Sequence, residues 1–130
     1  MTLYDSSVLI DYLDGVSETV DYIETRYEER AITIPLVMFE LYQGEVFRSG
    51  PAEFDALDGA LDWLTVVEGT PDLARSAGEL QDALYRRGEP LAARDAFIAG
   101  AAKGLDERLV VADSDFDVEV ITDELDVEFV

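Results

Sequence analysis

The chain has 130 residues, with 30 Asp and Glu against 9 Lys and Arg, and it contains neither His nor Cys. The missing residue types exclude disulfides, thiolate zinc sites, cysteine nucleophiles and every mechanism that needs a histidine base or ligand. A bound metal would need oxygen ligands, which favours a hard cation such as Mg²⁺ or Mn²⁺. One domain spanning residues 1–130 is expected at this length.

The formal net charge of −21 is the most unusual bulk property of the chain. Because 48% of the residues are apolar, the chain should fold and not remain disordered. Surfaces rich in acids and poor in lysine keep proteins soluble at high salt, where ions screen self-repulsion. Lys103 is the only lysine. We therefore expect a halophilic protein, with an acidic partner-binding surface as the alternative.

The sequence shows no sign of export or membrane insertion. Its first residues lack the basic start of a secretory signal. Its purely apolar stretches are far shorter than the ~20 residues that span a bilayer. We expect a soluble, cytoplasmic protein with no membrane partner.

Strand-like and helical patterns alternate along the chain. Short apolar or β-branched runs predict strands at 2–4, 31–35, 64–67, 109–112, 118–121 and 126–130. Apolar residues at helical spacing predict helices between 6 and 15 and at 18–30, 36–47, 51–63, 71–87 and 91–103. This alternation is typical of an α/β fold whose parallel sheet is covered by helices on both faces.

Two acidic positions follow predicted strands. Asp5 comes directly after the first strand, and Asp113 and Asp115 follow the strand at 109–112. Ligands of open α/β sheets bind at the carboxyl ends of strands, although Asp5 would also serve as a helix N-cap. The acid spacing after residue 112 also resembles an EF-hand loop. Val118 stands where that loop needs glycine, so we reject that assignment.

Two further acids lie inside predicted helices. Glu40 interrupts an apolar run and shares a helix face with Gly44, which would leave room for an approach to the backbone. A solvent-facing glutamate is the alternative. Asp95 shares a face with Ile98 and Ala99, where a carboxylate is costly to bury unless it is paired or binds metal. An acid near a helix N-terminus, favoured by the helix dipole, is the alternative there. Together, the four positions could form an all-oxygen site for divalent ions that support phosphodiester chemistry.

Four blocks of sequence, in order, resemble those of PIN-domain ribonucleases. They are Leu3–Asp11, Phe39–Gly44, Arg94–Ala102 and Ala112–Phe116, which resemble the family's D-[TS]-S, E-L-x-x-G, D-x-x-I-A-A and T-x-D-x-D-F motifs. The most similar subgroup is the small VapC-type toxins of toxin–antitoxin pairs. Val111 stands where the family usually has threonine.

The resemblance implies a PIN-like three-layer fold, with a central parallel sheet flanked by helices. It implies an endoribonuclease that depends on Mg²⁺ or Mn²⁺, hydrolyses RNA phosphodiester bonds, forms a homodimer and is inhibited by a cognate VapB-like antitoxin. The alternative is a non-catalytic PIN-like protein that uses the acidic site for partner assembly. The implied catalytic and metal-binding residues are Asp5, Glu40, Asp95 and Asp113, with Asp115 as a further metal ligand and Ser7 as a supporting or water-binding hydroxyl.

Three arginines near Asp95 in the sequence, Arg86, Arg87 and Arg94, are candidates for contacts with RNA phosphates. Ordinary charge at a helix C-terminus is the alternative for Arg86 and Arg87.

Overall fold

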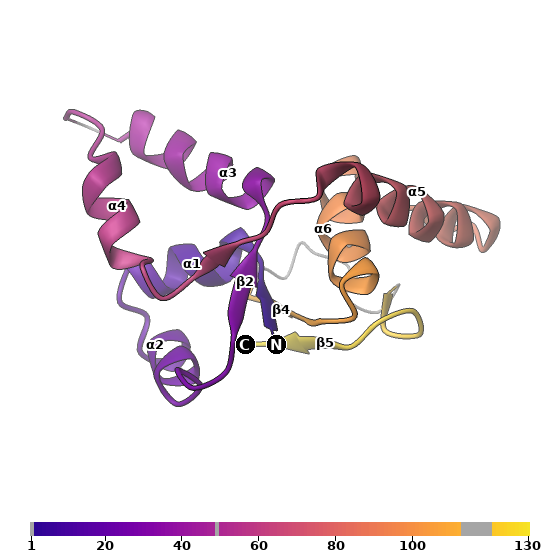
Figure 1. The fold of residues 1–130 in the computed structure, drawn as a ribbon, viewed down its shortest axis with the longest axis horizontal. Coiled ribbons are helices and arrows are strands. Elements are labelled where there is room, and N and C mark those ends of the chain that lie inside the picture. Colours follow the sequence, from indigo (N-terminus) through magenta and orange to yellow (C-terminus); the bar gives the residue numbers. More distant parts are fainter. Residues whose placement is uncertain (1, 49, 113–120) are drawn as a thin grey trace.

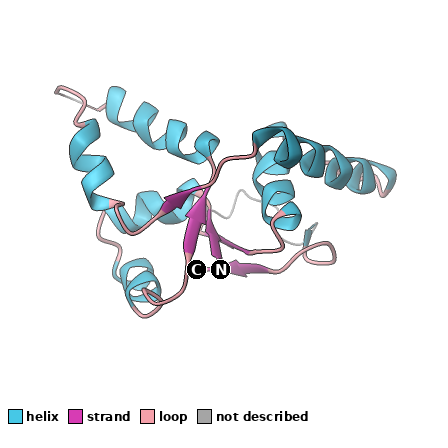
Figure 2. Cartoon of the chain, viewed as in Figure 1, coloured by secondary structure: helices cyan, strands magenta, loops and turns pink. Residues whose placement is uncertain are grey.

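The computed structural model describes residues 2–48, 50–112 and 121–130. Helices lie on both sides of a five-stranded sheet (Figures 1 and 2). The elements are, in chain order, β1 (Thr2–Tyr4), α1 (Ser6–Leu13), α2 (Ser17–Glu24), β2 (Ala31–Thr33), α3 (Pro35–Val46), α4 (Phe54–Ala60), β3 (Thr65–Val66), α5 (Thr70–Arg86), α6 (Ala93–Gly104), β4 (Arg108–Val111) and β5 (Val127–Phe129).

The sheet has the strand order β3-β2-β1-β4-β5, and every neighbouring pair is parallel. β1 therefore lies in the centre, where Leu3 pairs with Ile32 on one side and with Leu109 on the other. Helices α1 to α4 lie on one side of the sheet and α5 and α6 on the other (Figure 1). All three paired residues are almost wholly buried, as expected for a parallel sheet covered on both faces. The predicted α/β fold is confirmed.

Helices α5 and α6 pack unusually close together. A Cβ atom added at Gly100 of α6 would lie 2.2 Å from the Cα of Ala77 in α5. Only a residue without a side chain allows this approach of the two backbones. The small residues around Gly100 thus place α6, and with it Arg94 and Asp95 in its first turn, firmly against the rest of the domain.

Several predicted boundaries were wrong. The helix expected at 18–30 ends at Glu24, so Tyr27 lies beyond it, where it is about half exposed and lies beside Trp63. The helix expected at 51–63 is restricted to α4. The strand expected at 31–35 ends at Thr33, because Pro35 begins α3. Proline is well suited to the first position of a helix, where the backbone N–H would have no partner within the helix.

Part of one predicted strand lies outside the described residues. Of the run at 118–121, only Ile121 is described, and it is helical. In the part of the chain that the structure describes, no helix is both long enough and apolar enough to cross a bilayer.

Candidate functional site

Asp5 lies at the carboxyl end of the central strand. Its side chain is 1% exposed, and its backbone N–H donates to the Val110 carbonyl at 3.0 Å. Its Oδ2 caps α1 by accepting a hydrogen bond from the Ser7 amide at 3.3 Å and another from the Ser7 hydroxyl at 2.7 Å. The N-cap role and a place in the site are therefore compatible, because capping uses only one of the two carboxylate oxygens.

Ser7 joins Asp5 to the end of β4. Its Oγ donates to Asp5 and accepts a hydrogen bond from the Ala112 amide at 3.0 Å. A hydroxyl can do both at once, since it carries one proton and two lone pairs. Ser7 thus fixes the orientation of Asp5 relative to Ala112, the residue that follows β4.

Arg94 brings three of the predicted acids together. Its Nη2 donates to Asp5 Oδ1 at 3.0 Å and to the Ser6 hydroxyl at 2.5 Å. Its Nη1 donates to Asp95 Oδ1 at 2.7 Å, and its Nε donates to Glu40 Oε2. The acids come from the end of β1, from α3 and from α6, so one guanidinium joins three separate elements.

These contacts stabilise the positive charge of Arg94. Partial burial disfavours the charged guanidinium, but the hydrogen bond to Glu40 and the negative charge of Asp5 outweigh it and raise the pKa of Arg94 above its usual value. A cation in the first turn of a helix is itself unfavourable, because the N-terminal end of the helix dipole is positive. The neighbouring acids therefore compensate for an otherwise poor position.

Glu40 keeps one oxygen free of any hydrogen bond to the described residues. Its Oε2 accepts from Arg94, whereas its Oε1 is buried and has no hydrogen-bond partner in that part of the chain. Buried polar atoms without partners are uncommon and costly. This oxygen is a ready acceptor for a ligand. Gly44, on the same helix, is exposed, and a Cβ added there would meet no atom within 4 Å.

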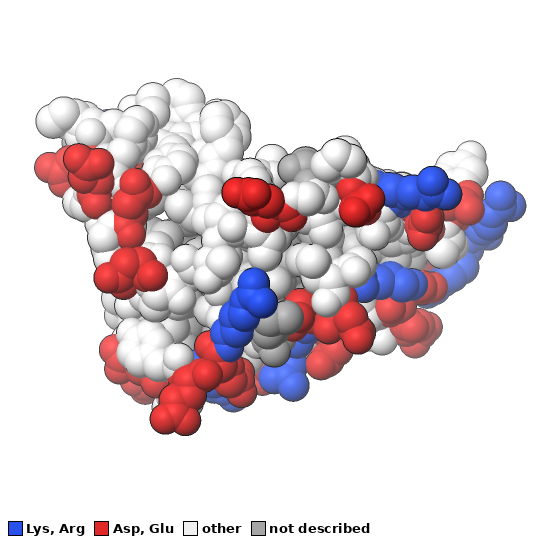
Figure 3. Space-filling view, viewed as in Figure 1, with Lys and Arg blue, Asp and Glu red and all other residues white. Residues whose placement is uncertain are grey.

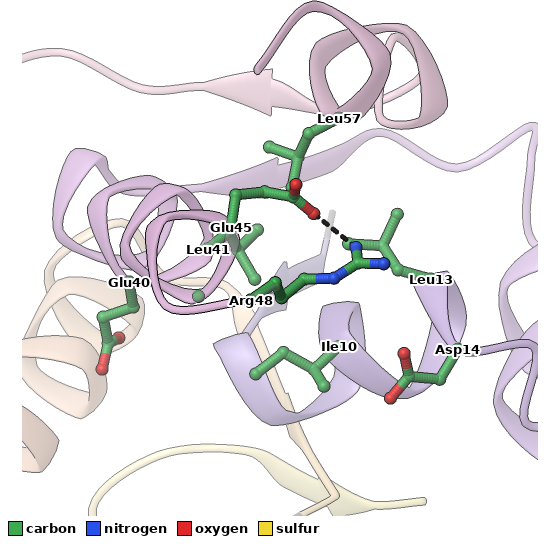
Figure 4. Close-up of a pocket in the computed structure, with 9 residues that line it drawn as sticks. Ile10, Leu13, Asp14, Glu40, Leu41, Glu45, Arg48 and Leu57 are labelled. Carbon is green, nitrogen blue, oxygen red and sulfur yellow. Dashed lines mark hydrogen bonds and ion pairs between the residues drawn. The ribbon is translucent and has the colours of Figure 1, made fainter. Parts of the chain in front are cut away.

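A groove of about 200 Å³ adjoins Glu40 between α1, α3 and α4. Figure 4 shows its apolar side chains, contributed by all three helices, with the Arg48–Glu45 ion pair (2.7 Å) at the C-terminal end of α3. Glu40 lies on one side of the view and Asp14 on the other. The residues that line it are Ile10, Leu13, Asp14, Glu40, Leu41, Gly44, Glu45, Arg48 and Leu57.

The cluster of Asp5, Glu40 and Asp95 around Arg94, called the acidic pocket below, fits a divalent cation in the chemistry of its donors but not in their present spacing. Asp5, Glu40 and Asp95 offer only carboxylate oxygens, which suit Mg²⁺ or Mn²⁺. Each contacts a different nitrogen of Arg94, so the three surround a planar group and not a point. Accordingly, the described ranges contain no group of three or more acidic, His or Cys side chains arranged to hold an ion.

The other predicted site residues lie apart from the acidic pocket or outside the described residues. Asp113 and Asp115 lie outside the described residues. Arg86 pairs with Asp82 on the same helix. Arg87, in the turn after α5, contacts Glu89 and also approaches acids of the segment after residue 121.

The link from Arg94 to the acids was missed by sequence reasoning, which assigned Arg94 to phosphate contacts only. The available signal was its unfavourable position: an arginine beside Asp95 at the start of a helix needs acidic neighbours. Which acids supply them depends on the tertiary fold, since Asp5 lies 89 positions away in sequence.

The fold is shared with solved toxin–antitoxin proteins. A chain of the VapBC2 complex from Rickettsia felis, bound to a promoter DNA fragment, superposes with a TM-score of 0.82 at 17% identity, covering 98% of this chain and 97% of that one. A chain of VapBC-1 from nontypeable Haemophilus influenzae gives 0.78 at 19%, covering 98% and 96%. One of VapBC-5 from Mycobacterium tuberculosis gives 0.68 at 23%, covering 99% and 96%.

Sequence comparison gives the family directly. No curated protein matches the chain. The family model of the PIN domain matches residues 2–118, which is most of the sequence. With the parallel sheet and the flanking helices, this match establishes that the chain belongs to the PIN domain family.

Proposed function

We propose that this protein is a metal-dependent endoribonuclease that hydrolyses RNA phosphodiester bonds and acts as a VapC-like toxin. One observation carries the proposal: Asp5, Glu40 and Asp95 come from three separate elements and converge at the carboxyl end of the central strand. Family membership and the likeness to VapBC structures support it. We assign Asp113 and Asp115, which follow β4 in the sequence, to the same set.

The side chains of the pocket have separable roles in this proposal. Asp5, Glu40, Asp95 and the acids after β4 would hold Mg²⁺ or Mn²⁺. Bound there, the ion would supply an activated water and offset negative charge at the scissile phosphate. Ser7 holds Oδ2 of Asp5, which leaves Oδ1 directed into the pocket, where Arg94 contacts it.

RNA binding must overcome the charge of the protein. A chain of net charge −21 repels a polyanion at low salt, and salt screens that repulsion. On the face shown in Figure 3, several Lys and Arg side chains lie toward the end of the molecule where α5 lies and others lie near the lower middle, while acids are spread over the whole face. We infer that Arg86, Arg87 and Arg94 supply local phosphate contacts in a salt-rich cytoplasm.

The groove beside Glu40 suits the inhibitory partner. Its apolar lining and its acids Asp14, Glu40 and Glu45 would complement a segment with apolar and basic side chains. We propose a VapB-like antitoxin as that partner, since the similar structures include VapBC complexes. The antitoxin would be encoded by a short neighbouring reading frame. The homodimer stays a prediction.

The groove assignment can be tested with two matched variants. Ile10 lines the groove and is 45% exposed, whereas Val16 is 42% exposed and lies outside it. Ile10→Glu should abolish co-purification with the product of the neighbouring gene, while Val16→Glu should leave it intact. Equal capture by both variants would reject the groove as the docking site.

The nuclease assignment is tested by removing single charges. We expect Asp5→Asn and Asp95→Asn to abolish cleavage of a labelled RNA in molar KCl with Mn²⁺, with circular dichroism spectra like that of the wild type. Asp55→Asn, an exposed acid in the first turn of α4, is the matched control and should cleave normally. EDTA should stop all cleavage. Full activity in both pocket variants would refute the assignment.

A non-catalytic PIN-like binding protein is the second candidate. The contacts of Arg94 with all three described acids favour this candidate. An acidic pocket that holds its own arginine could contribute to binding a partner protein without taking part in catalysis. Absence of cleavage with Mg²⁺ and Mn²⁺ at every salt concentration, together with tight partner binding, would support this candidate instead.

A further inference from the structure

We propose that Arg94 is a built-in, exchangeable counterion of the acidic pocket, which leaves the pocket when a divalent cation binds. The inference deepens the proposed function and rests on its metal site. It makes a distinct claim, that the free protein carries a cation of its own where the ion would bind. The metal-free and metal-bound states would then differ in the position of one side chain.

The contacts place the guanidinium between the acids. Its Nε, Nη1 and Nη2 donate to Glu40, Asp95 and Asp5, so every nitrogen of the group is used. Oxygens that bind Mg²⁺ must lie ~2.0–2.1 Å from a single point. Carboxylates held apart by the width of a guanidinium cannot meet that requirement. Arg94 must therefore move out before these three acids can close around an ion.

Charge balance favours such an exchange. Three carboxylates against one guanidinium leave a pocket of net charge −2, and the buried Oε1 of Glu40 has no hydrogen-bond partner among the described residues. A divalent ion in place of Arg94 would reduce the net charge of the three carboxylates and their cation from −2 to −1. Arg94 alone thus neutralises only one of the three carboxylate charges and leaves Oε1 of Glu40 without a hydrogen bond from the described residues.

The Arg94 side chain can move from the acidic pocket into solvent. Its side chain is 36% exposed, whereas those of Asp5, Asp95 and Glu40 are 1%, 20% and 25% exposed. The arginine therefore lies nearer to solvent than the acids that it joins. Rotation of its flexible stem would release it without moving α6, which is fixed by the close packing of Gly100 on Ala77.

The competing explanation is a permanent structural ion-pair network. In that case removing Arg94 would destabilise the protein and disorder the acids, so that cation binding would weaken. If Arg94 is exchangeable, removing it eliminates a competitor and cation binding strengthens. The two explanations predict opposite changes in the dissociation constant.

The test measures Mn²⁺ binding by calorimetry in the wild type, Arg94→Gln and the matched control Arg75→Gln. Arg75 is exposed and pairs only with Glu79 on the surface of α5 among the interactions described. We expect Arg94→Gln to bind Mn²⁺ at least ~10-fold more tightly than the wild type, because a like charge close to the ion is removed. Arg75→Gln should stay within about twofold, since exposed charges are screened. Arg94→Lys, which keeps the charge but loses the three-nitrogen fork, should be intermediate and serves if the glutamine variant does not fold.

A second readout follows the side chain itself. In a titration with diamagnetic Mg²⁺, the NMR signal of Arg94 Nε–H, assigned by its absence in Arg94→Gln, should move toward the position of a solvent-exposed arginine. Unchanged or weaker Mn²⁺ binding in Arg94→Gln, or an Arg94 signal unaffected by Mg²⁺, would overturn the exchange alone. Failure of every variant, including the wild type, to bind Mn²⁺ would overturn the proposed metal site as well.

Discussion

The Ser7 hydroxyl accepts a hydrogen bond from the Ala112 amide at 3.0 Å, so the first turn of α1 is tied to the end of β4. The same hydroxyl donates to Asp5. The Ser7 side chain therefore joins the carboxyl ends of the neighbouring strands β1 and β4. Asp5 follows β1 directly, and Asp113 and Asp115 follow β4 in the sequence. A small residue near the N-terminus sets the geometry of a pocket built from distant parts of the chain.

We expect Ser7→Ala to weaken Mn²⁺ binding by ~10–100-fold, as is usual when a residue that orients a metal ligand is removed. Asp5 would keep only the long backbone hydrogen bond to its capping oxygen, and the Ala112 amide would lose its partner. Calorimetry measures the affinity, and Ser17→Ala, at an exposed serine in α2, is the control. Wild-type affinity in Ser7→Ala would show that Ser7 does not position Asp5.

A pair of glycine substitutions should change stability in opposite directions. Gly100→Ala would place a Cβ 2.2 Å from the Ala77 Cα, so we expect it to destabilise the fold by roughly 1–3 kcal/mol or more. Gly78→Ala adds a Cβ that meets nothing within 4 Å in the middle of α5, so it should stabilise by ~0.5–1 kcal/mol. Urea unfolding followed by circular dichroism measures both. Equal effects would mean that α5 and α6 are not packed this closely.

Salt should stabilise this protein strongly. The formal charge of −21 creates self-repulsion in dilute buffer, which molar KCl screens. We expect the melting temperature to rise steadily with KCl concentration and the protein to loosen or unfold in low salt. A melting temperature equal in dilute buffer and in molar KCl would contradict the expectation that this is a halophilic protein.

The order of strands and helices was predictable because each element carries its own local signal. The repeat of Leu73, Ala77, Leu80 and Leu84 predicts a helix at 71–87, and the structure has α5 at Thr70–Arg86. Tyr27 shows where such signals fail. Its spacing from Ile23 extends the helical pattern, yet the helix ends at Glu24 and the ring packs on Trp63 instead. Only tertiary contacts determine that outcome.

The acids of the site were predictable individually, whereas their shared partner was not. Asp5 was identified from its place after a strand, and Glu40 and Asp95 from their unusual helix faces. The structure joins these three through Arg94. The position of Arg94 at the start of a helix predicts acidic neighbours, but it does not identify them, because Asp5 and Glu40 lie far away in the sequence. Whether Asp113 and Asp115 complete the set stays a prediction.

The central place of β1 affects how the protein is made. β1, at residues 2–4, pairs with β4, at residues 108–111, so a long stretch of chain is synthesised between the two strands. Pairing between such distant segments is slow to form, because a long loop must close first. The pocket at the end of β1 therefore cannot assemble on a chain that still lacks β4. The finished site would then exist only after β4 has been synthesised and has paired with β1.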